Sequence, residues 1–417
     1  MKPKMKIEHD KKPAHLLSYG ILIFFLVGYI VTPLFNTLLQ AFRSEAGYGI
    51  QVFTSYFANE NQVRVVGNTA LLGVASVIVC GILGLALALY MTFMAGKEKK
   101  AVHILLLSPM MIPGVITVIS FIQLYGESGI ITKALEYLFN LPEAPFSFRG
   151  FGAIVFVIAY TQYVYFYLNI YVALKYVDYS AIEAARAMGA PVIRVFRDVI
   201  WPVITPAVLT SVVITFASGI SAFSAPNLIG GGFKVLSTQI VRSKANNHME
   251  IASAQVVILF VMSVAVMLLI HYYSRRCGVK SSARATPSPA HSGKSGLFAI
   301  ACKGLIAVQV ILIMLPILAI LYLSFIKTQS IMLMIFPRGF TTENYQLIFE
   351  NPPGPEAACK QFEDVAAGGC GRSADHRARI LFDRAGQKRL QRGDQIFDHA
   401  ALGNAGQRDR HQSYQYL

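Results

Sequence analysis

Seven long runs of this sequence contain no Asp, Glu, Lys or Arg, and this feature limits the chain to folds that keep such runs away from water. The runs are residues 13–42, 65–96, 101–126, 150–174, 199–233, 251–274 and 304–326. Each is at least as long as the roughly 20 residues that a helix needs to cross a hydrocarbon core. Because a helix satisfies its own backbone hydrogen bonds, we predict seven membrane-spanning helices rather than buried helices of a water-soluble protein.

The charged residues are concentrated at the C-terminal end of the sequence. Only 14% of the chain is charged, yet residues 351–417 hold 18 of the 59 charged side chains. This tail has too little apolar content for a packed core, so we expect it to be disordered. Our hypothesis is that it is an out-of-frame translation that replaced the rest of a second half. A genuine disordered extension is the alternative.

The formal net charge of +15 is distributed in a way that predicts topology. Cations cluster before the first run and after the second, fourth and sixth runs. They are Lys2, Lys4, Lys6, Lys11, Lys12, Lys97, Lys99, Lys100, Arg186, Arg194, Arg197, Arg275, Arg276, Lys280 and Arg284. The positive-inside rule then predicts a multi-pass membrane protein with a cytoplasmic N-terminus. Cations on a single folded face would be needed for nucleic-acid binding, and we expect no such partner.

The order of the runs predicts the domain organisation. We expect a cytoplasmic tail at residues 1–14, a six-span domain at 15–273, and a cytoplasmic Ser- and Pro-containing linker at 274–295. We predict that residues 296–350 are the first span of a second half that repeats the start of the six-span domain. The segment from Pro33 to Phe42 resembles the segment from Pro316 to Phe325, 283 residues later. Repeated halves are common in transporters. Chance similarity between apolar segments is the alternative.

A connection between the fourth and fifth runs, residues 178–202, has a distinctive local pattern. Ser180 and Glu183 have the spacing of a capping box, which predicts a helix that begins there. Gly189 can adopt the left-handed conformation that ends a helix, and a proline follows it. A helix of about two turns is marginal alone in water, so it needs a surface to dock on.

The side chains of this short helix indicate the kind of surface. Ala184 and Met188, and likewise Ala185 and Gly189, lie four apart, so we expect one smooth face of small residues, with Arg186 elsewhere. A second element follows, with Val192 and Val195 on its apolar side, and Pro202 then starts the fifth span. Physical reasoning leaves two interpretations open: a helix that inserts into a groove of a partner protein, and an amphipathic connector on the membrane surface.

The pattern Glu183-Ala184-Ala185, then Gly189, then Val199-Ile200-Trp201-Pro202 resembles the EAA loop of binding-protein-dependent ABC importer permeases. Val199 and Trp201 depart from the family's Ile-x-Leu-Pro-like ending. The resemblance covers residues 15 to about 350. It implies an all-α, multi-pass protein of the cell inner (plasma) membrane. The expected fold is a six-helix permease core of the type I, MetI-like importer fold, followed by the first helix of a second half and a disordered tail.

The resemblance also implies the partners and the roles of residues. Ser180, Glu183, Ala184, Ala185, Met188, Gly189 and Pro202 become the expected ATPase-coupling residues. The expected partners are an ABC ATPase subunit in two copies, a periplasmic substrate-binding protein, a second permease half or second copy, and membrane lipid. The chain is then a transport subunit rather than an enzyme, with no catalytic, cofactor-binding or metal-binding residues, and ATP is bound by the partner subunit.

The six-span-plus-second-half plan, with Phe223-Ser224-Ala225-Pro226 and the triplet Gly230-Gly231-Gly232, looks most like fused ferric-iron permeases. Phosphonate and polyamine permeases share the architecture and stay open as alternatives. A secondary transporter is disfavoured because such proteins usually need buried Asp, Glu or His, and the apolar runs hold almost none. An inactive truncated fragment is the remaining alternative.

Overall fold

The computed structural model describes residues 19–20, 22–44, 47–94, 99–276, 297–326 and 339–350. The chain divides into two compact units, Met1–Leu323 and Ser324–Leu417. The predicted tail at 351–417, most of the linker at 274–295 and the N-terminal residues 1–14 lie outside the described residues.

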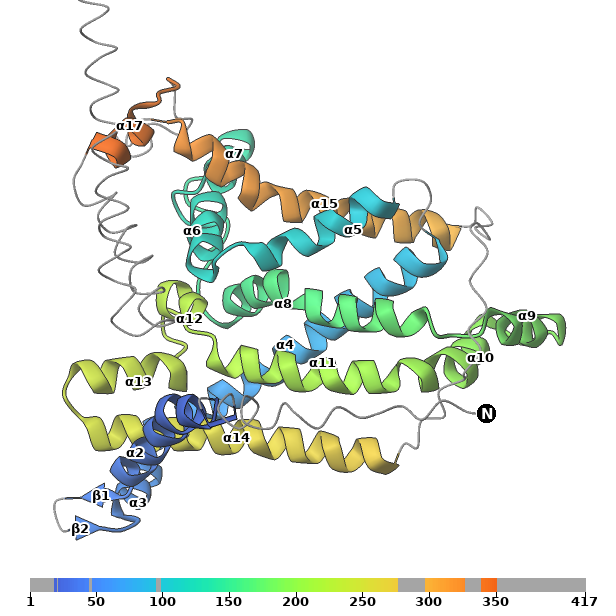
Figure 1. The fold of residues 1–417 in the computed structure, drawn as a ribbon. Helices are drawn as coiled ribbons and strands as arrows, with labels where there is room; N and C mark the ends of the chain where they lie inside the picture. The colour runs from blue at the N-terminus through green and yellow to red at the C-terminus, as the bar shows by residue number, and fades with distance from the viewer. Residues whose placement is uncertain are drawn as a thin grey trace, which may run out of the picture. The chain divides into compact units, whose positions relative to one another are not determined.

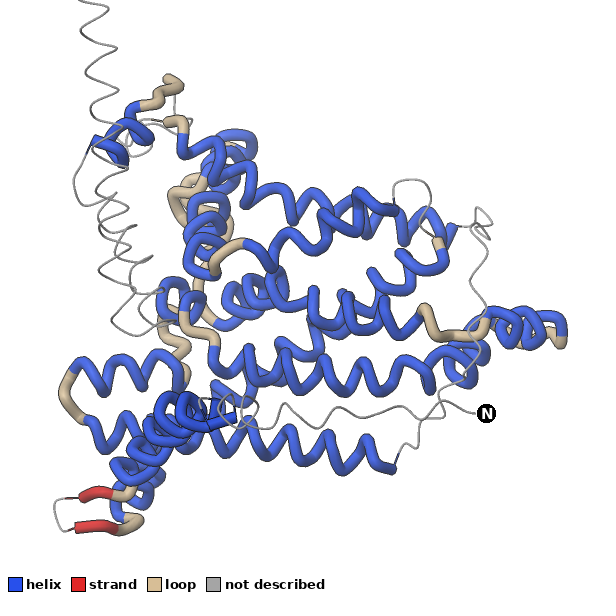
Figure 2. Tube along the Cα trace, in the orientation of Figure 1, coloured by secondary structure: helices blue, strands red, loops and turns tan. Residues whose placement is uncertain are grey.

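Helices dominate the described residues of the first unit (Figure 2). In chain order the elements are η1 (Val27–Val31), α2 (Thr32–Ala41), β1 (Arg43–Ser44), β2 (Gly47–Tyr48), α3 (Gln51–Ala58), α4 (Glu60–Phe93), α5 (Lys99–Leu107), η2 (Ser108–Met111), α6 (Gly114–Tyr125), α7 (Ile130–Phe139), α8 (Phe151–Leu174), α9 (Tyr179–Ala187), α10 (Val192–Val195), η3 (Phe196–Ile200), α11 (Trp201–Ser221), α12 (Ser224–Ile229), α13 (Leu236–Ala245), α14 (Met249–Arg276) and α15 (Leu297–Ser324). The short strands β1 and β2 pair antiparallel.

Seven helical stretches among the described residues are long and apolar enough to cross a membrane, one for each predicted run. They are Leu22–Ala41, Glu60–Phe93, Gly114–Phe139, Phe151–Leu174, Val192–Ser221, Met249–Arg275 and Ile306–Ser324. Helix α8 alone, at 24 residues, is about 36 Å long, which exceeds a hydrocarbon core of about 30 Å. The prediction of a seven-span, all-α membrane protein is confirmed.

We expected each apolar run to form one continuous helix, but the third and fifth runs do not. The third run breaks between α5 and α6, where Pro109 lies in the 3₁₀ turn η2 and Ile112 is extended before Pro113. A proline disfavours the helical conformation of the residue before it, which explains the break. The fifth run ends as a helix at Ser221, and α12 follows as a separate short helix.

Helix α8 is the centre of the bundle, packed against α4 and α11 (Figure 1). The Tyr163 hydroxyl donates to the carbonyl oxygen of Leu106 in α5 (2.6 Å), and the Asn169 amide donates to the hydroxyl of Ser211 in α11 (2.9 Å). Such interhelical bonds stabilise packing where neither helix can gain from leaving water. Small residues let the backbones approach: a Cβ on Gly84 of α4 would lie 2.8 Å from the backbone nitrogen of Tyr167.

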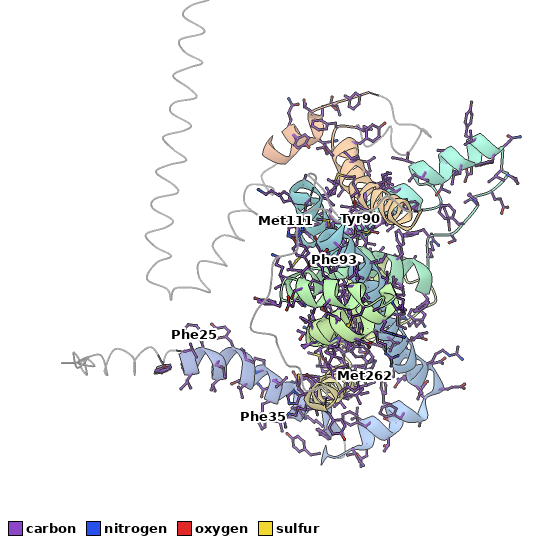
Figure 3. The ribbon with its side chains drawn as sticks, turned by 90° about the vertical axis from the view of Figure 1, so that its right-hand side faces the viewer. Phe25, Phe35, Tyr90, Phe93, Met111 and Met262 are labelled. Atoms are coloured by element: carbon purple, nitrogen blue, oxygen red, sulfur yellow. The ribbon has the colours of Figure 1, made fainter. Side chains whose placement is uncertain are left out.

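Helix α15, which we predicted as the first span of a second half, contacts α8 within the first unit. The Tyr160 hydroxyl of α8 donates to the carbonyl oxygen of Ile313 (3.1 Å), and Ile306 and Ile313 belong to the same buried cluster as α8. The N-terminal span is different. Its most apolar window has no buried residue, and Figure 3 shows Phe25 and Phe35 on a helix that projects sideways from the bundle.

The two copies of the predicted repeat share their local geometry. In the first copy, the Phe42 carbonyl accepts from the Gly49 N–H (2.8 Å), and the Phe42 ring lies 5.2 Å from that of Phe53 in α3. In the second unit, the Phe325 carbonyl accepts from the Thr341 N–H (2.7 Å), and the Phe325 ring lies 5.4 Å from that of Tyr345 in α17 (Glu343–Glu350). Each long helix therefore ends at a phenylalanine that anchors the returning chain and the next short helix.

Candidate coupling loop and family

The connection between α8 and α11 projects from one end of the bundle, where α9 extends past the ends of both long helices (Figure 1). Helix α9 starts after Asp178, whose carboxylate accepts from the Ser180 backbone N–H (3.1 Å) and from the Ser180 hydroxyl (2.8 Å). The capping-box prediction was therefore wrong in its residue. Asp178 is the N-cap, and Ser180 is already the second residue of the helix, too far in for that role.

The C-terminus of α9 matches the sequence prediction. Gly189 has φ +80°, the left-handed conformation, and its N–H donates to the Arg186 carbonyl (2.9 Å). The next N–H, of Ala190, donates to the Ala185 carbonyl (3.0 Å). These two bonds form a Schellman motif, and Pro191 then prevents the helix from continuing.

One face of the loop is anchored on the bundle. Ile182 is 2% exposed and joins the main buried cluster together with Val177 and Val195. Ala185 and Ala190 are partly buried against the same cluster. Ala185 therefore faces inward, and our expectation of one smooth face that includes both Ala184 and Ala185 was wrong.

The opposite face of the loop is exposed, and it is apolar around the left-handed glycine. Glu183 and Ala184 are exposed, and Met188 is 82% exposed. Val192 and Ile193 at the start of α10 are each 73% exposed. Of the two valines that we expected on the apolar inner side, Val195 is buried as predicted and Val192 is exposed. Sequence reasoning did not single out Ile193. Three large apolar side chains that face outward at one tip form a surface suited to contact with another protein.

A nearly continuous helix connects this surface to the centre of the bundle. Residues Val192–Ser221 form one stretch in which η3 widens the turn and Pro202 lies in the first turn of α11. Proline lacks an N–H and its ring conflicts with the carbonyl four residues back, here Asp198, which accounts for the wider turn. Because α11 packs against α4 and α8, a displacement of the loop would be transmitted to the spans.

The acidic, histidine and cysteine side chains of the described residues do not gather into a metal site. Among the described residues, no group of three or more His, Cys, Asp or Glu side chains gathers where it could hold a metal ion. Lys133 and Glu136 lie in α7, after the third predicted run, and their charged atoms are 2.7 Å apart.

Residues 81–279 match the family model described as "Binding-protein-dependent transport system inner membrane component". These residues belong to that family. The matched segment runs from the middle of α4 through α14 and contains the whole connection between α8 and α11. Over the matched residues, the family and the apolar helices are those of a multi-pass inner-membrane component of a binding-protein-dependent transport system, as the motif predicted.

The curated relatives of this chain are named for transport of different substrates. The "Probable ABC transporter permease protein y4fN" of Sinorhizobium fredii (strain NBRC 101917 / NGR234) is 26% identical over 79% of this chain and 58% of its own length. The "Ferric transport system permease protein FbpB" of Actinobacillus pleuropneumoniae is 28% identical over 62% of this chain and 37% of its own. The "Putative 2-aminoethylphosphonate transport system permease protein PhnU" of Salmonella typhi is 26% identical over 64% of this chain and 91% of its own. The chain thus covers less than two thirds of the length of the first two relatives.

The fold of the permease also matches solved importer structures. A chain of the "bacterial alginate ABC transporter in complex with alginate pentasaccharide-bound periplasmic protein" aligns with a TM-score of 0.56 at 20% identity, over 67% of this chain and 100% of that chain. This likeness establishes the type I, MetI-like fold of the six-helix core.

Proposed function

We propose that the chain is the transmembrane permease subunit of an ATP-driven importer and that residues 178–202 couple it to a separate ATPase. The observation that carries the proposal is the exposed tip formed by Met188, Val192 and Ile193 on a loop anchored by Ile182. An exposed apolar surface on a fixed support is what a docking partner needs, whereas a connector on the membrane surface needs no rigid anchor.

The mechanism follows from the continuity of the loop with the spans. The ATPase pair closes on nucleotide, displaces α9 and α10, and moves α11 relative to α4 and α8. This coupling between two sites through a rigid element would switch the spans between outward-open and inward-open states. Ser180, Glu183, Ala184, Met188 and Gly189 then contact or shape the ATPase interface. Ala185 and Pro202 instead hold the loop in position.

A second permease half, or a second copy of the chain, completes the transporter in this proposal. The support is the N-terminal span, whose most apolar window is unburied here, while α15 already packs against α8. By the symmetry of the repeat, the N-terminal span would pack against the counterpart of α8. A periplasmic binding protein delivers the substrate, and the coupling loop and the N-terminus face the cytoplasm.

Ferric iron is the substrate we propose, with phosphonate and polyamine as alternatives. The support is the likeness in span plan to fused ferric-iron permeases and the match to a relative named for ferric transport. Uptake of labelled Fe³⁺ in the presence of a candidate periplasmic binding protein, competed separately by 2-aminoethylphosphonate and by spermidine, distinguishes the three classes. Absence of Fe³⁺ uptake, or loss of that uptake on addition of either organic compound, would contradict the iron assignment.

The direct functional experiment is co-purification with a candidate ABC ATPase subunit. We expect the complex to form with the intact chain and to disappear when residues 180–198 are deleted, with the deleted protein still inserted in the membrane. Retention of the ATPase after that deletion would overturn the coupling assignment. Uptake driven by an ion gradient without ATP would favour the secondary transporter. An absence of uptake even with a second half supplied would indicate an inactive fragment.

A further inference from the structure

Two lysines converge on one aromatic ring where α8 meets the proposed coupling loop. The Lys175 Nζ lies 4.8 Å from the centre of the Tyr171 ring, and the Lys99 Nζ lies 5.7 Å from it. The His103 ring lies tilted against the same tyrosine, with ring centres 5.0 Å apart, and its Nδ1 contacts the Tyr167 hydroxyl at 2.5 Å. We call Lys99, His103, Tyr171 and Lys175 the cationic cluster.

The cationic cluster packs on a buried tyrosine of α8. Tyr167 is fully buried and stacks on Tyr171 with their ring centres 5.8 Å apart. The cluster itself is half-buried apart from Lys175, which is exposed. A cation over an aromatic face is stabilised by the ring quadrupole, which explains why both ammonium groups settle on this tyrosine.

The cluster has an excess of positive charge. In the described part of the chain the ion pairs join Lys133 to Glu136 and Arg149 to Glu127, near the opposite end of α8. Burial and the charge of Lys175 lower the pKa of Lys99, so the two ammonium groups oppose each other. An anion between them would relieve this repulsion.

The position of the cluster indicates which anion. Lys99 is the first residue of α5 and Lys175 follows the last residue of α8, so both lie at the end of the bundle where a span meets the headgroup region. The same two helices expose apolar side chains within about two turns of the lysines. They are Ile104 on α5 and Leu168 and Val172 on α8. A phosphate above exposed apolar side chains is the arrangement of a phospholipid.

We propose that the cationic cluster binds the phosphate of an anionic phospholipid headgroup beside the coupling loop. The lipid would lie next to Lys175 and Tyr176, which come three and two residues before Asp178, the N-cap of α9. It would thereby hold the end of α8 from which the loop projects.

The test uses the full chain in detergent micelles, with bound lipid measured by native mass spectrometry. We expect phosphatidylglycerol to bind more tightly than phosphatidylcholine. Lys99→Gln and Lys175→Gln should each weaken phosphatidylglycerol binding about fivefold, and the double variant about 25-fold. The matched control is Lys100→Gln, an exposed lysine on the same helix with the same charge change, which should leave binding unchanged.

Several results would overturn the proposal. Equal losses for Lys99→Gln and Lys100→Gln would indicate diffuse surface charge instead of a site. Displacement of the lipid by excess inorganic phosphate would assign the cluster to a free anion. If the lysine variants fail to fold, Tyr171→Leu and Tyr171→Phe replace them. The proposal requires that Tyr171→Leu weakens phosphatidylglycerol binding and that Tyr171→Phe leaves it unchanged. The opposite pattern refutes the proposal.

Discussion

The backbone N–H of Ala190 donates to the carbonyl oxygen of Ala185 across the end of α9, and the two atoms are 3.0 Å apart. This bond requires the residue between Met188 and Ala190 to be left-handed, and Gly189 is, with φ +80°. The exposed tip of the coupling loop is therefore shaped by the backbone at a single residue.

Replacement of Gly189 tests whether that backbone shape matters. A Cβ at this position would meet no atom within 4 Å, so the cost of a side chain comes from the left-handed conformation alone. We expect Gly189→Val to strain the loop by about 1–2 kcal/mol and to weaken ATPase binding. Gly189→Asn, which tolerates this conformation, should retain most of the binding in a pull-down assay. Equal loss in both variants would show that side-chain bulk, and not backbone shape, is responsible.

Ile182 and Met188 should have opposite roles. Ile182 is 2% exposed, so Ile182→Ala should destabilise the protein by about 2–4 kcal/mol, measured by thermal unfolding in detergent. Met188 is exposed, so Met188→Ala should leave the unfolding temperature unchanged and weaken ATPase binding. A stability loss for Met188→Ala would contradict the placement of this side chain.

The N-cap assignment can be tested with two carboxylates on the same loop. Asp178→Ala removes the acceptor for the Ser180 N–H and should cost about 1 kcal/mol. Glu183→Gln, at an exposed position, should not change stability but should reduce ATPase binding. If Glu183→Gln instead lowers the unfolding temperature as much as Asp178→Ala does, the capping box is present after all.

Two glycines one turn apart on α4 test the close approach of α4 and α8. A Cβ on Gly84 would overlap Phe166 and lie 2.8 Å from the backbone nitrogen of Tyr167, whereas a Cβ on Gly81 would lie 3.5 Å from the Phe166 ring. We expect Gly84→Ala to lower stability by about 1–3 kcal/mol and Gly81→Ala to be neutral or slightly stabilising. Equal thermal stability of the two variants would refute the helix contact as described.

Much of the fold could be predicted because membrane spans are local in sequence. The uncharged runs predict the membrane-spanning helices, and the Gly189-Ala190-Pro191 sequence predicts the end of α9. The start of α9 was ambiguous because Asp178 and Ser180 both suit an N-cap. Burial of Val177 and Ile182, a tertiary contact, is what selects Asp178.

The details that sequence reasoning missed depend on packing between distant segments. The outward orientation of Val192 follows from Val195 and Ile200 filling the core, and a four-residue helix is too short for its periodicity to reveal this. The contact of α15 with Tyr160 joins residues 153 positions apart, and no local pattern encodes it.

A photo-crosslinking amino acid at position 188 gives the most direct test of the coupling assignment. Met188 is 82% exposed at the tip of the loop, and Leu138 in α7, at 73%, provides an equally exposed apolar control outside the loop. In membranes that contain the chain and its ATPase subunit, irradiation should yield a crosslink to the ATPase from position 188 and none from position 138. Crosslinks of equal yield from both positions, or a crosslink only from position 138, would contradict the proposed coupling loop.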